Sequence, residues 1–421
     1  MLQDLLMLAA FFILRIGVPL LLVVGIGYSL LQRFYGVKLD FSPKFVTGVG
    51  LVLALWALAA ITLILRFTSG LGAVTNLSDQ FPLGLWIGFD VMAGAMLGGG
   101  AFVLAGLVYV FGIERYRPIL RSTILTAFLG YSLLIVALLI DVGRPQNILL
   151  ARPVYFINIH SVLWEVAICV LCYTAVLALE FAPALFERLR WKRMWQLTHK
   201  ITLPLVIVGI LLSTMHQSSL GSLWLIAPGK LHGLWYSPLL PVFFWLSAIA
   251  VGLAMVTVES NLSSRAFKRG LEQDLLARLA KANAYLLAFY AAFRFADLAV
   301  RGQLDLVLVP NLPGALFWIE LGLGAILPAA LLMQSRIREN KNALFAIAGV
   351  VVACGILNRL NVSMFGLYTY TGPVYIPSWM EVVLTAAMFT FGAAVFGVLA
   401  RLLPVFPAEH APELEIVPIK S

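Results

Sequence analysis

Residues 83–112 have the sequence LGLWIGFDVMAGAMLGGGAFVLAGLVYVFG, in which Asp90 is the one charged side chain. A bilayer core needs about 20 apolar residues per helical span, so this stretch predicts a transmembrane helix. Comparable stretches recur from Leu5 to Leu403 with short polar breaks between them. Of the 421 residues, 62% are hydrophobic and only 12% are charged, which excludes an ordinary soluble domain.

The whole chain is predicted to be an all-α, polytopic membrane protein. In lipid every backbone amide must be satisfied within its own segment, so helices are the spanning structure that this hydropathy supports. The alternation typical of strands is absent from the sequence. We predict about eleven spans, at approximately 6–33, 46–70, 83–112, 119–142, 160–182, 200–218, 238–259, 276–300, 312–335, 343–361 and 379–403.

The basic residues predict the orientation of these spans. If the first span runs from outside to inside, most of the 29 lysines and arginines fall in segments on the cytoplasmic side. This bias fixes topology in membrane proteins, so the net charge of +9 indicates orientation and not nucleic-acid binding. The N-terminus is therefore expected outside and the C-terminus in the cytoplasm.

The spans are predicted to form two four-helix bundles with additional segments around them. No residue-by-residue repeat relates the two bundles. The expected organisation is an additional N-terminal helix (1–45), a helix and outer loop (46–82), a first bundle (83–218), a connecting helix and loops (219–275), a second bundle (276–403) and a cytoplasmic tail (404–421).

Ionisable residues inside the first bundle are the strongest functional signal. An ionisable side chain within a span costs a few kcal/mol, so each one requires a partner or a function. Asp90, Asp141, His160, Glu165 and His216 all belong to the four spans between 83 and 218, towards their outer halves. We therefore expect these side chains to converge at one depth.

Local spacing adds detail to this expectation. Trp86 and Asp90 are four residues apart and share one helix face. The same helix carries glycines at G-x-x-x-G spacing, which allow close helix approach. These glycines are Gly84, Gly88, Gly94 and Gly98.

The neighbouring spans carry further polar groups at the same end. Asp141 and Arg144 are three residues apart, so they could form an ion pair that is either a structural clamp or part of a site. Ser161 and Glu165 share a face just after His160. A simpler interpretation is that all these residues only pair with one another to hold the bundle.

A quinone site needs this combination of groups. Reduction to quinol takes two electrons and two protons, with hydrogen bonds to two carbonyl oxygens, an apolar wall and a nearby group that exchanges protons. The residues expected to exchange protons are Asp90, His160, Glu165 and His216. Those expected to contact the quinone are Trp86, Asp141, Arg144, Ser161 and Gln217.

Haem is the chemical alternative, because histidine pairs between helices ligate b-type haem. The five histidines are too few near the inner face for two stacked haems, but one outer haem between His160 and His216 is an open alternative. Cys169 and Cys172 lie within one apolar helix and are expected to be buried thiols. We expect no metal, haem or iron–sulfur cluster in this chain.

Several longer motifs resemble one protein family. They are Phe81-Pro82-x-Gly84-x-Trp86-Ile87-x-Phe89-Asp90, Asp141-Val142-Gly143-Arg144, His160-Ser161-Val162-Leu163-x-Glu165, Leu179 to Leu189, Met215-His216-Gln217-Ser218-Ser219-x-Gly221-Ser222, Phe317-Trp318-Ile319-Glu320 and Arg401-Leu402-Leu403-Pro404. These motifs resemble the NrfD/PsrC family, specifically the HybB-type membrane subunits of [NiFe] hydrogenase-2-like respiratory complexes. The resemblance runs from about residue 46 to 406, and the additional first span with Arg15 departs from it.

The resemblance implies a quinone-reactive membrane subunit of the bacterial or archaeal cytoplasmic membrane, which is not catalytic alone. Its implied partners are a periplasmic ferredoxin-like iron–sulfur subunit and the large and small subunits of a [NiFe] hydrogenase, or another periplasmic metalloenzyme. Electrons would pass between the iron–sulfur subunit and menaquinone or ubiquinone, with H2 oxidation and proton translocation as further expectations. A haem-bearing cytochrome b subunit and a secondary transporter are the alternatives.

Overall fold

The computed structural model describes residues 43–145, 160–226, 228–372 and 374–406. Over these residues the regular structure is helical and contains no strand, which confirms the all-α prediction. Within this described part, nine helices are long and apolar enough to cross a membrane. The first predicted span (6–33), which includes Arg15, and residues 407–421 of the predicted tail lie outside the described residues.

The nine helices coincide with nine of the predicted spans. They are Thr47–Ser69, Trp86–Val110, Glu114–Asp141, Val162–Arg188, Lys192–Ser222, Leu240–Phe267, Leu312–Leu332, Lys341–Leu367 and Trp379–Leu402. A further long helix, α11 (Gln273–Val300), occupies the predicted span 276–300 but is less apolar. The chain is thus a polytopic membrane protein, although the predicted count of eleven is not exact.

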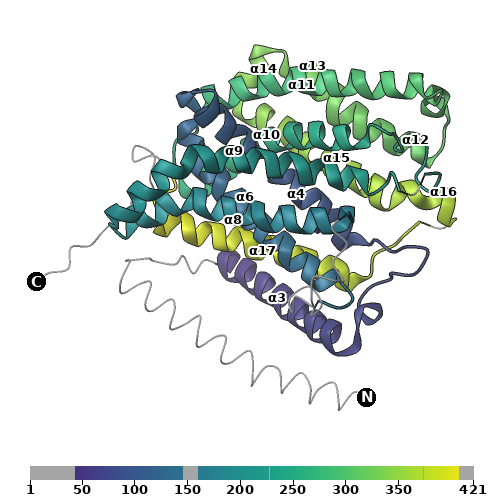
Figure 1. Ribbon diagram of the computed structural model, residues 1–421, viewed down its shortest axis with the longest axis horizontal. Helices are drawn as coiled ribbons and strands as arrows, with labels where there is room; N and C mark the ends of the chain where they lie inside the picture. The colour runs from purple at the N-terminus through teal and green to yellow at the C-terminus, as the bar shows by residue number, and fades with distance from the viewer. Residues whose placement is uncertain (1–42, 146–159, 227, 373, 407–421) are drawn as a thin grey trace, which may run out of the picture. The chain divides into compact units, whose positions relative to one another are not determined.

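Residues Val52–Ala411 form one compact unit, and its long helices run side by side (Figure 1). One of the spans, from Trp86 to Val110, is not a single regular helix. It consists of a π-helix (Trp86–Ala93), the short helices α4 (Gly94–Leu97) and α5 (Gly100–Ala105), and a second π-helical turn (Gly106–Val110). Glycine weakens a helix interior, and the two glycines Gly98 and Gly99 separate α4 from α5, which itself begins at Gly100.

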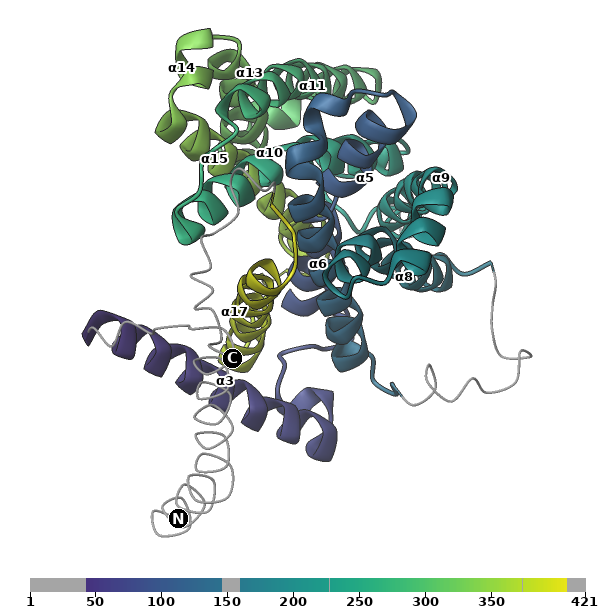
Figure 2. The same ribbon diagram turned by 90° about the vertical axis from the view of Figure 1, so that its left-hand side faces the viewer.

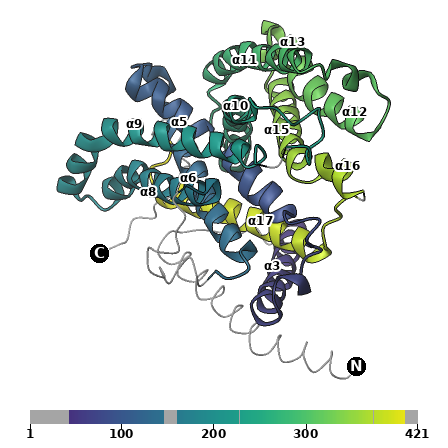
Figure 3. The ribbon, with the colours of Figure 1, turned by 45° about the vertical axis from the view of Figure 1, so that its right-hand side comes forward.

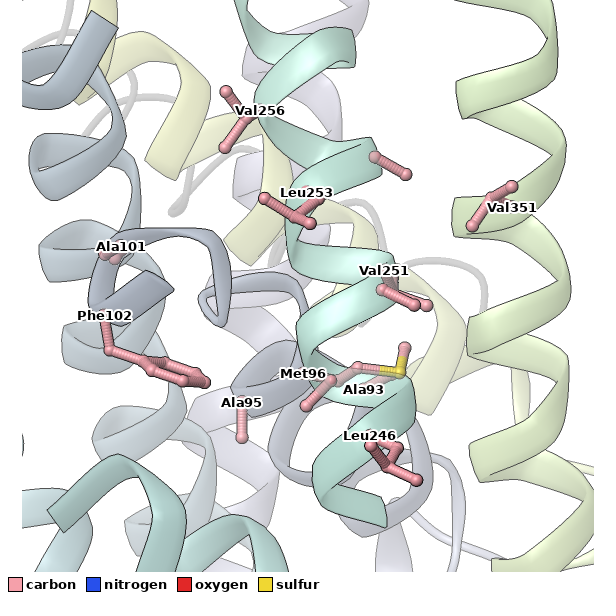
Figure 4. Close-up of a cluster of buried hydrophobic side chains, with 14 of the residues drawn as sticks. Ala93, Ala95, Met96, Ala101, Phe102, Leu246, Val251, Leu253, Val256 and Val351 are labelled. Carbon is pink, nitrogen blue, oxygen red and sulfur yellow. The ribbon is translucent and has the colours of Figure 1, made fainter. Parts of the chain in front are cut away.

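These glycines allow two backbones to touch. A side-chain carbon on Gly99 would lie 2.6 Å from the carbonyl oxygen of Ala248 in α10 (Leu240–Phe267). One on Gly252, also in α10, would overlap the backbone of Gly99 and Gly100. Figure 4 shows Met96 beside Val251 at this contact. The expected close helix approach therefore exists, but its closest backbone contact uses Gly99, Gly100 and Gly252.

The broken helix packs within a first group of helices. Its partners are α6 (Arg117–Asp141) and α9 (Lys192–Ser222), and α8 (Val162–Arg188) lies between these two partners. α8 and α9 are neighbours along most of their length, as Figure 2 shows at its right-hand side. The interior of this group is a continuous apolar cluster that extends into α10.

A second group lies on the other side of α10. It contains α11, α15 (Lys341–Ser363) and the span built from α12 (Leu312–Phe317), the π-helix Trp318–Ile326 and α13 (Leu327–Leu332). α11, α13 and α15 gather at the top of Figure 2. α10 contacts helices of both groups and is therefore their common wall.

A buried polar network holds the second group together. The Glu320 carboxylate accepts hydrogen bonds from the side-chain amides of Asn358 (2.6 Å) and Asn361 (2.8 Å), and from the Trp235 indole (2.7 Å). Arg359, which is fully buried, donates to Asn358 (2.6 Å) and stacks over the ring of Phe244. Polar groups buried in this way need such partners, so we assign this network a structural role.

The last helix, α17 (Trp379–Leu402), packs against α6 and the π-helix Trp86–Ala93. It also contacts α3 (Pro43–Ser69), where the Trp56 indole donates to the hydroxyl of Thr390 (3.0 Å). Only 11% of its most apolar window is buried. α17 is therefore a lightly packed helix that covers one side of the first group.

Candidate functional site

Asp90 lies where the π-helix Trp86–Ala93 faces α17. Its carboxylate oxygen Oδ2 accepts a hydrogen bond of 2.8 Å from the hydroxyl of Thr385. Asp90 is half-buried and lines a cavity of about 360 Å³. π-helical turns are rare and often occur at functional sites, because the wider turn redirects one side chain.

The cavity lies between α6, α10, α17 and the helical segments that follow Trp86. Along α17 it extends from Thr385 to Gly397, which corresponds to roughly 18 Å at 1.5 Å per residue. Most of its wall is apolar, with Leu133, Met388 and Phe396 among the lining side chains. The shape is that of an elongated apolar chamber with few polar groups.

Two of those polar groups lack hydrogen-bond partners. Glu259 and Thr126 are among the lining residues, and the Oε1 atom of Glu259 and the hydroxyl of Thr126 are inaccessible to solvent and have no hydrogen-bond partner among the described residues. The other carboxylate oxygen of Glu259 accepts from the Ser122 hydroxyl (3.2 Å). Because an unsatisfied buried polar atom is costly, Glu259 and Thr126 are a second polar feature of the lining beside Asp90.

Glu381 organises the polypeptide at the Asp90 end of the cavity. Its carboxylate, which is 1% exposed, accepts from the Tyr375 hydroxyl (2.6 Å) and from the backbone amides of Leu85 (3.2 Å) and Asn76 (3.3 Å). It also caps α17 in a capping box with Ser378. Burial and the Glu381 carboxylate raise the pKa of Tyr375, so this hydroxyl stays a donor.

Trp86 is held by the same helix end. Its indole nitrogen donates to the backbone oxygen of Glu381 (3.3 Å), and its ring is 1% exposed. A side chain this deeply buried anchors the π-helix against α17. Trp86 therefore fixes the direction in which Asp90 points.

The structure does not form the ion pair considered between Asp141 and Arg144. Arg144 is exposed, and the positive charge beside Asp141 belongs to Arg66 of α3. Arg66 donates to the backbone oxygens of Ile140 (2.6 Å) and Val142 (2.7 Å), which satisfies carbonyls at the end of α6. Asp141 Oδ1 has no hydrogen-bond partner among the described residues.

His216 occupies the interior of the first group and is fully buried. Its Nδ1 lies 2.8 Å from the carbonyl oxygen of Leu212, so Nδ1 carries a proton. Its Nε2 lies 2.7 Å from the hydroxyl of Tyr131, which donates to it while the ring is neutral. Tyr173 packs against both rings, at 4.8 Å from Tyr131 and 5.5 Å from His216.

The Tyr131 hydroxyl has a second acceptor within reach. The carbonyl oxygen of Ala95 lies 3.0 Å from it, and Gln217 also donates to this carbonyl (2.8 Å). If His216 gains a proton at Nε2, it can donate to Tyr131, which then donates to Ala95. The cluster thus supports two hydrogen-bond arrangements that differ by one proton on the imidazole.

Glu165 lies near the start of α8 and contacts the same helix as His216. Its carboxylate accepts a hydrogen bond of 2.7 Å from the hydroxyl of Ser219 in α9. Ser161 is the residue before α8 and is half-buried, whereas His160 is exposed. Of these three predicted residues, Glu165 has the recorded hydrogen bond to a helix of the first group.

The predicted residues therefore fall into two groups. Trp86, Asp90 and Asp141 lie on the α17 side of the broken helix, whereas Glu165, His216 and Gln217 lie between α6, α8 and α9. The two groups come close to each other at Gly98. Gly98 lines the cavity, and a side-chain carbon added to it would lie 2.5 Å from the Tyr131 ring.

The sequence did not reveal Tyr131, Thr385 or Arg66 as members of these groups. Each lies on a span distant in sequence from its partner, and hydroxyls and tyrosines are common in membrane helices. Only the folded arrangement identifies them. Glu381 was recognisable as a charge within a span, but its four donors come from loops whose course the sequence does not define.

The histidine arrangement does not fit an axial pair for haem. Both ring nitrogens of His216 are within hydrogen-bond distance of other groups, and the ring is sealed by Tyr131 and Tyr173. Haem ligation requires one free imidazole nitrogen that faces an open pocket. His160, the predicted second ligand, is an exposed residue at the start of α8.

Comparison with known proteins places the chain in a family. Residues 73–369, which make up more than half of the chain, match the family model described as "Polysulphide reductase, NrfD". The chain belongs to the NrfD family. The NrfD-matching region includes the broken helix, both helix groups and every predicted site residue.

Two curated relatives cover most of this NrfD protein. The "Probable Ni/Fe-hydrogenase 2 b-type cytochrome subunit" of Escherichia coli K12 is 35% identical over 380 residues, which are 88% of this chain and 94% of the relative. The "Menaquinone reductase, integral membrane subunit" of Nitratidesulfovibrio vulgaris is 29% identical over 384 residues, or 84% and 90%. The predicted resemblance to the NrfD family and its hydrogenase-2 branch is thereby confirmed.

Proposed function

We propose that this NrfD protein is the quinone-reactive membrane subunit of a respiratory oxidoreductase, and that it exchanges electrons between an iron–sulfur subunit and menaquinone or ubiquinone. The observation that carries this proposal is the cavity of about 360 Å³ with Asp90 and Thr385 at one end. Small-molecule sites combine a mostly apolar wall with a few oriented polar groups, and a quinone has this mixed character.

The chemistry at Asp90 follows from what quinone reduction requires. One quinone takes up two electrons from the iron–sulfur partner and two protons to become quinol. A protonated Asp90 can donate a hydrogen bond to a quinone oxygen through Oδ1 while its Oδ2 accepts from Thr385, and Asp90 can transfer its proton to that oxygen. Phe89 and Met388 supply apolar surface beside these groups.

We propose that protons reach the cavity from the cytoplasmic side through Glu259. This residue lies near the end of α10 that the basic-residue bias assigns to the cytoplasm, it lines the cavity, and its buried Oε1 atom has no hydrogen-bond partner among the described residues. The Tyr131–His216 pair is a second candidate for proton exchange, since its hydrogen bonds can reverse. Proton uptake on one side with electron entry on the other would move charge across the membrane.

We propose a [NiFe] hydrogenase as the catalytic partner, joined through a periplasmic ferredoxin-like iron–sulfur subunit. The Escherichia coli relative, a probable Ni/Fe-hydrogenase 2 subunit that is 35% identical to this chain, supports this choice. A different periplasmic metalloenzyme is the second candidate, which the menaquinone reductase relative favours. Purification of the complex from its native membrane, followed by identification of the attached subunits, distinguishes the two.

The site is tested by Asp90→Asn in the intact complex. We expect quinone-linked turnover to fall by at least about 10-fold, because the carboxyl proton is lost, while dye-linked activity of the catalytic subunit is unchanged. Asp79→Asn is the matched control, since Asp79 is exposed in the loop before Trp86. Wild-type quinone turnover in Asp90→Asn would refute the assignment.

A further inference from the structure

The turn between α8 and α9 carries a cluster of basic side chains. Residues 187–193 are all exposed. Four of them are cationic, and two apolar side chains lie among them, with Leu189 59% and Trp191 53% exposed. We call this cluster the hairpin patch, and it comprises Arg188, Leu189, Arg190, Trp191, Lys192 and Arg193.

The basic side chains of the hairpin patch have no recorded partner in the described part of the chain. Among these residues the structure records no ion pair or hydrogen bond from the side chain of Arg188, Arg190, Lys192 or Arg193. The one acid beside them, Glu187, is already bonded to Arg121 of α6 at 2.8 Å. The patch is therefore positively charged without internal compensation.

Several other arginines on the same side of the protein are engaged within the described residues. Arg269 is buried and pairs with Glu272 at 2.8 Å, and Arg265 lies over the ring of Phe345. Arg338 donates to two backbone oxygens near the end of α13. The orientation bias explains why basic residues occur on this side, but it does not explain why four cations without recorded partners gather within six residues of one turn.

The turn that presents the patch is well defined. Arg190 adopts a left-handed backbone conformation (φ 56°), and its amide bonds to the Glu187 oxygen at 3.2 Å. The amide of Trp191 bonds to the Phe186 oxygen at 2.9 Å, and the two aromatic rings meet edge to face at 5.7 Å. The basic side chains are thus held on a structured hairpin.

Helix length places this hairpin in the headgroup region. α9 has 31 residues, which gives a length of roughly 46 Å at 1.5 Å per residue, whereas the hydrocarbon core is about 30 Å thick. In Figures 1 and 3 the joined ends of α8 and α9 lie at the left edge of the described chain. The exposed polar residues between Lys192 and Lys200 continue the patch along the turns of α9 that extend beyond the hydrocarbon core.

We propose that the hairpin patch binds the headgroups of anionic phospholipids. Phosphate groups of such lipids match the guanidinium and ammonium groups, and acyl chains match the exposed Leu189 and Trp191, because tryptophan prefers the membrane interface. An acidic protein surface would satisfy the charges but would not account for two apolar side chains at the bilayer boundary. This inference does not depend on the quinone proposal.

The test compares two fourfold variants of the full chain in nanodiscs. The hairpin variant is R188Q/R190Q/K192Q/R193Q. The control variant, K268Q/K281Q/R336Q/K341Q, removes the same charge from exposed residues on the same side that have no recorded ion pair or side-chain hydrogen bond within the described chain. Cardiolipin or phosphatidylglycerol is titrated into phosphatidylcholine nanodiscs, and bound lipid is counted by native mass spectrometry.

We expect the hairpin variant to bind anionic lipid roughly 1,000-fold more weakly, since each of the four basic residues contributes on the order of 1 kcal/mol and about 1.4 kcal/mol corresponds to a factor of ten. The control variant and the charge-conserving R188K/R190K/R193K should bind within about 3-fold of wild type. Excess inorganic phosphate should not displace the lipid, whereas salt should weaken its binding.

Three results would overturn the inference. They are equal loss of lipid in both fourfold variants, unchanged lipid binding in the hairpin variant, and displacement of lipid by inorganic phosphate alone. Release of an acidic subunit from the hairpin variant, with lipid binding intact, would identify a protein partner and would also refute the lipid assignment. Unchanged thermal unfolding of the variants excludes a folding defect as the cause.

Discussion

Replacement of Thr385 by valine tests whether the hydrogen bond to Asp90 matters for quinone chemistry. The substitution keeps the shape of the side chain but removes the hydroxyl that lies 2.8 Å from Asp90 Oδ2. The structure records no other side-chain hydrogen bond to Asp90 among the described residues. Thr385→Val therefore deprives the half-buried carboxyl of its one recorded side-chain partner.

The size of the effect follows from the chemistry of that bond. A hydrogen bond to a charged group contributes about 1.5–3 kcal/mol, and about 1.4 kcal/mol corresponds to a factor of ten. Asp90 becomes a carboxylate once it has transferred its proton to the quinone, and the Thr385 hydroxyl stabilises that charge. Without this bond, quinone-linked turnover should fall by roughly 10- to 100-fold. The fall should appear mainly in kcat, because the hydroxyl contributes little to binding of the apolar tail.

The assay compares quinone-linked turnover of the intact complex with its dye-linked activity, which bypasses the membrane subunit. Thr202→Val is the control, because the Thr202 hydroxyl bonds only within its own helix, to the Thr198 oxygen at 2.9 Å. Turnover of Thr385→Val within about 2-fold of the Thr202→Val level would show that the bond is incidental, because a lost bond of this class should cost at least 10-fold.

Three further predictions concern stability, each measured by thermal unfolding in detergent. Tyr131→Phe should cost about 1–3 kcal/mol, because His216 Nε2 then loses its buried partner; no change in Tm would contradict the described hydrogen bond. Gly252→Ala should cost about 1–3 kcal/mol through overlap with the neighbouring backbone, whereas Gly349→Ala, which faces open space, should be neutral or stabilising. Burial lowers the pKa of His232 below its ordinary 6.5, so the imidazole takes up a proton more readily in the unfolded chain than in the folded one. The free energy of unfolding should therefore fall as the pH drops from about 6.5 towards the lowered pKa. His232→Gln should reduce this dependence of stability on pH.

The spans were predictable because hydropathy is a local property. Each long helix in the described residues coincides with a predicted span, since a run of about 20 apolar residues has few other stable structures in lipid. The breaks within a span were harder to predict from the sequence. The π-helix at Trp86–Ala93 and the interruption at Gly98 and Gly99 depend on contacts with α10 and α17 that local sequence does not encode.

For the candidate site, the sequence indicated which ionisable groups would need partners but not how they are arranged. Asp90, Glu165 and His216 were selected because buried ionisable groups are costly, and the structure does give each one a specific partner. The sequence could not tell that Asp90 faces α17 while His216 faces Tyr131, because a helix face is chosen by packing with distant segments. The site as a whole, including the roles of His160 and Arg144, stays a prediction.

The attachment of α17 has a consequence for how a guest molecule would enter the cavity. Its first turn is fixed by Glu381, and the chain just after its last turn is fixed by Arg121, which donates to the Pro404 oxygen at 2.9 Å, and by the buried Phe406. Between these ends, the recorded side-chain hydrogen bonds to other helices are those of Thr385 with Asp90 and of Trp56 with Thr390. Passage from lipid would therefore break these two bonds and bend the turns around Phe389, while both ends stay in place. Spin labels at the centre of α17 should then report a wider range of distances than labels at either end.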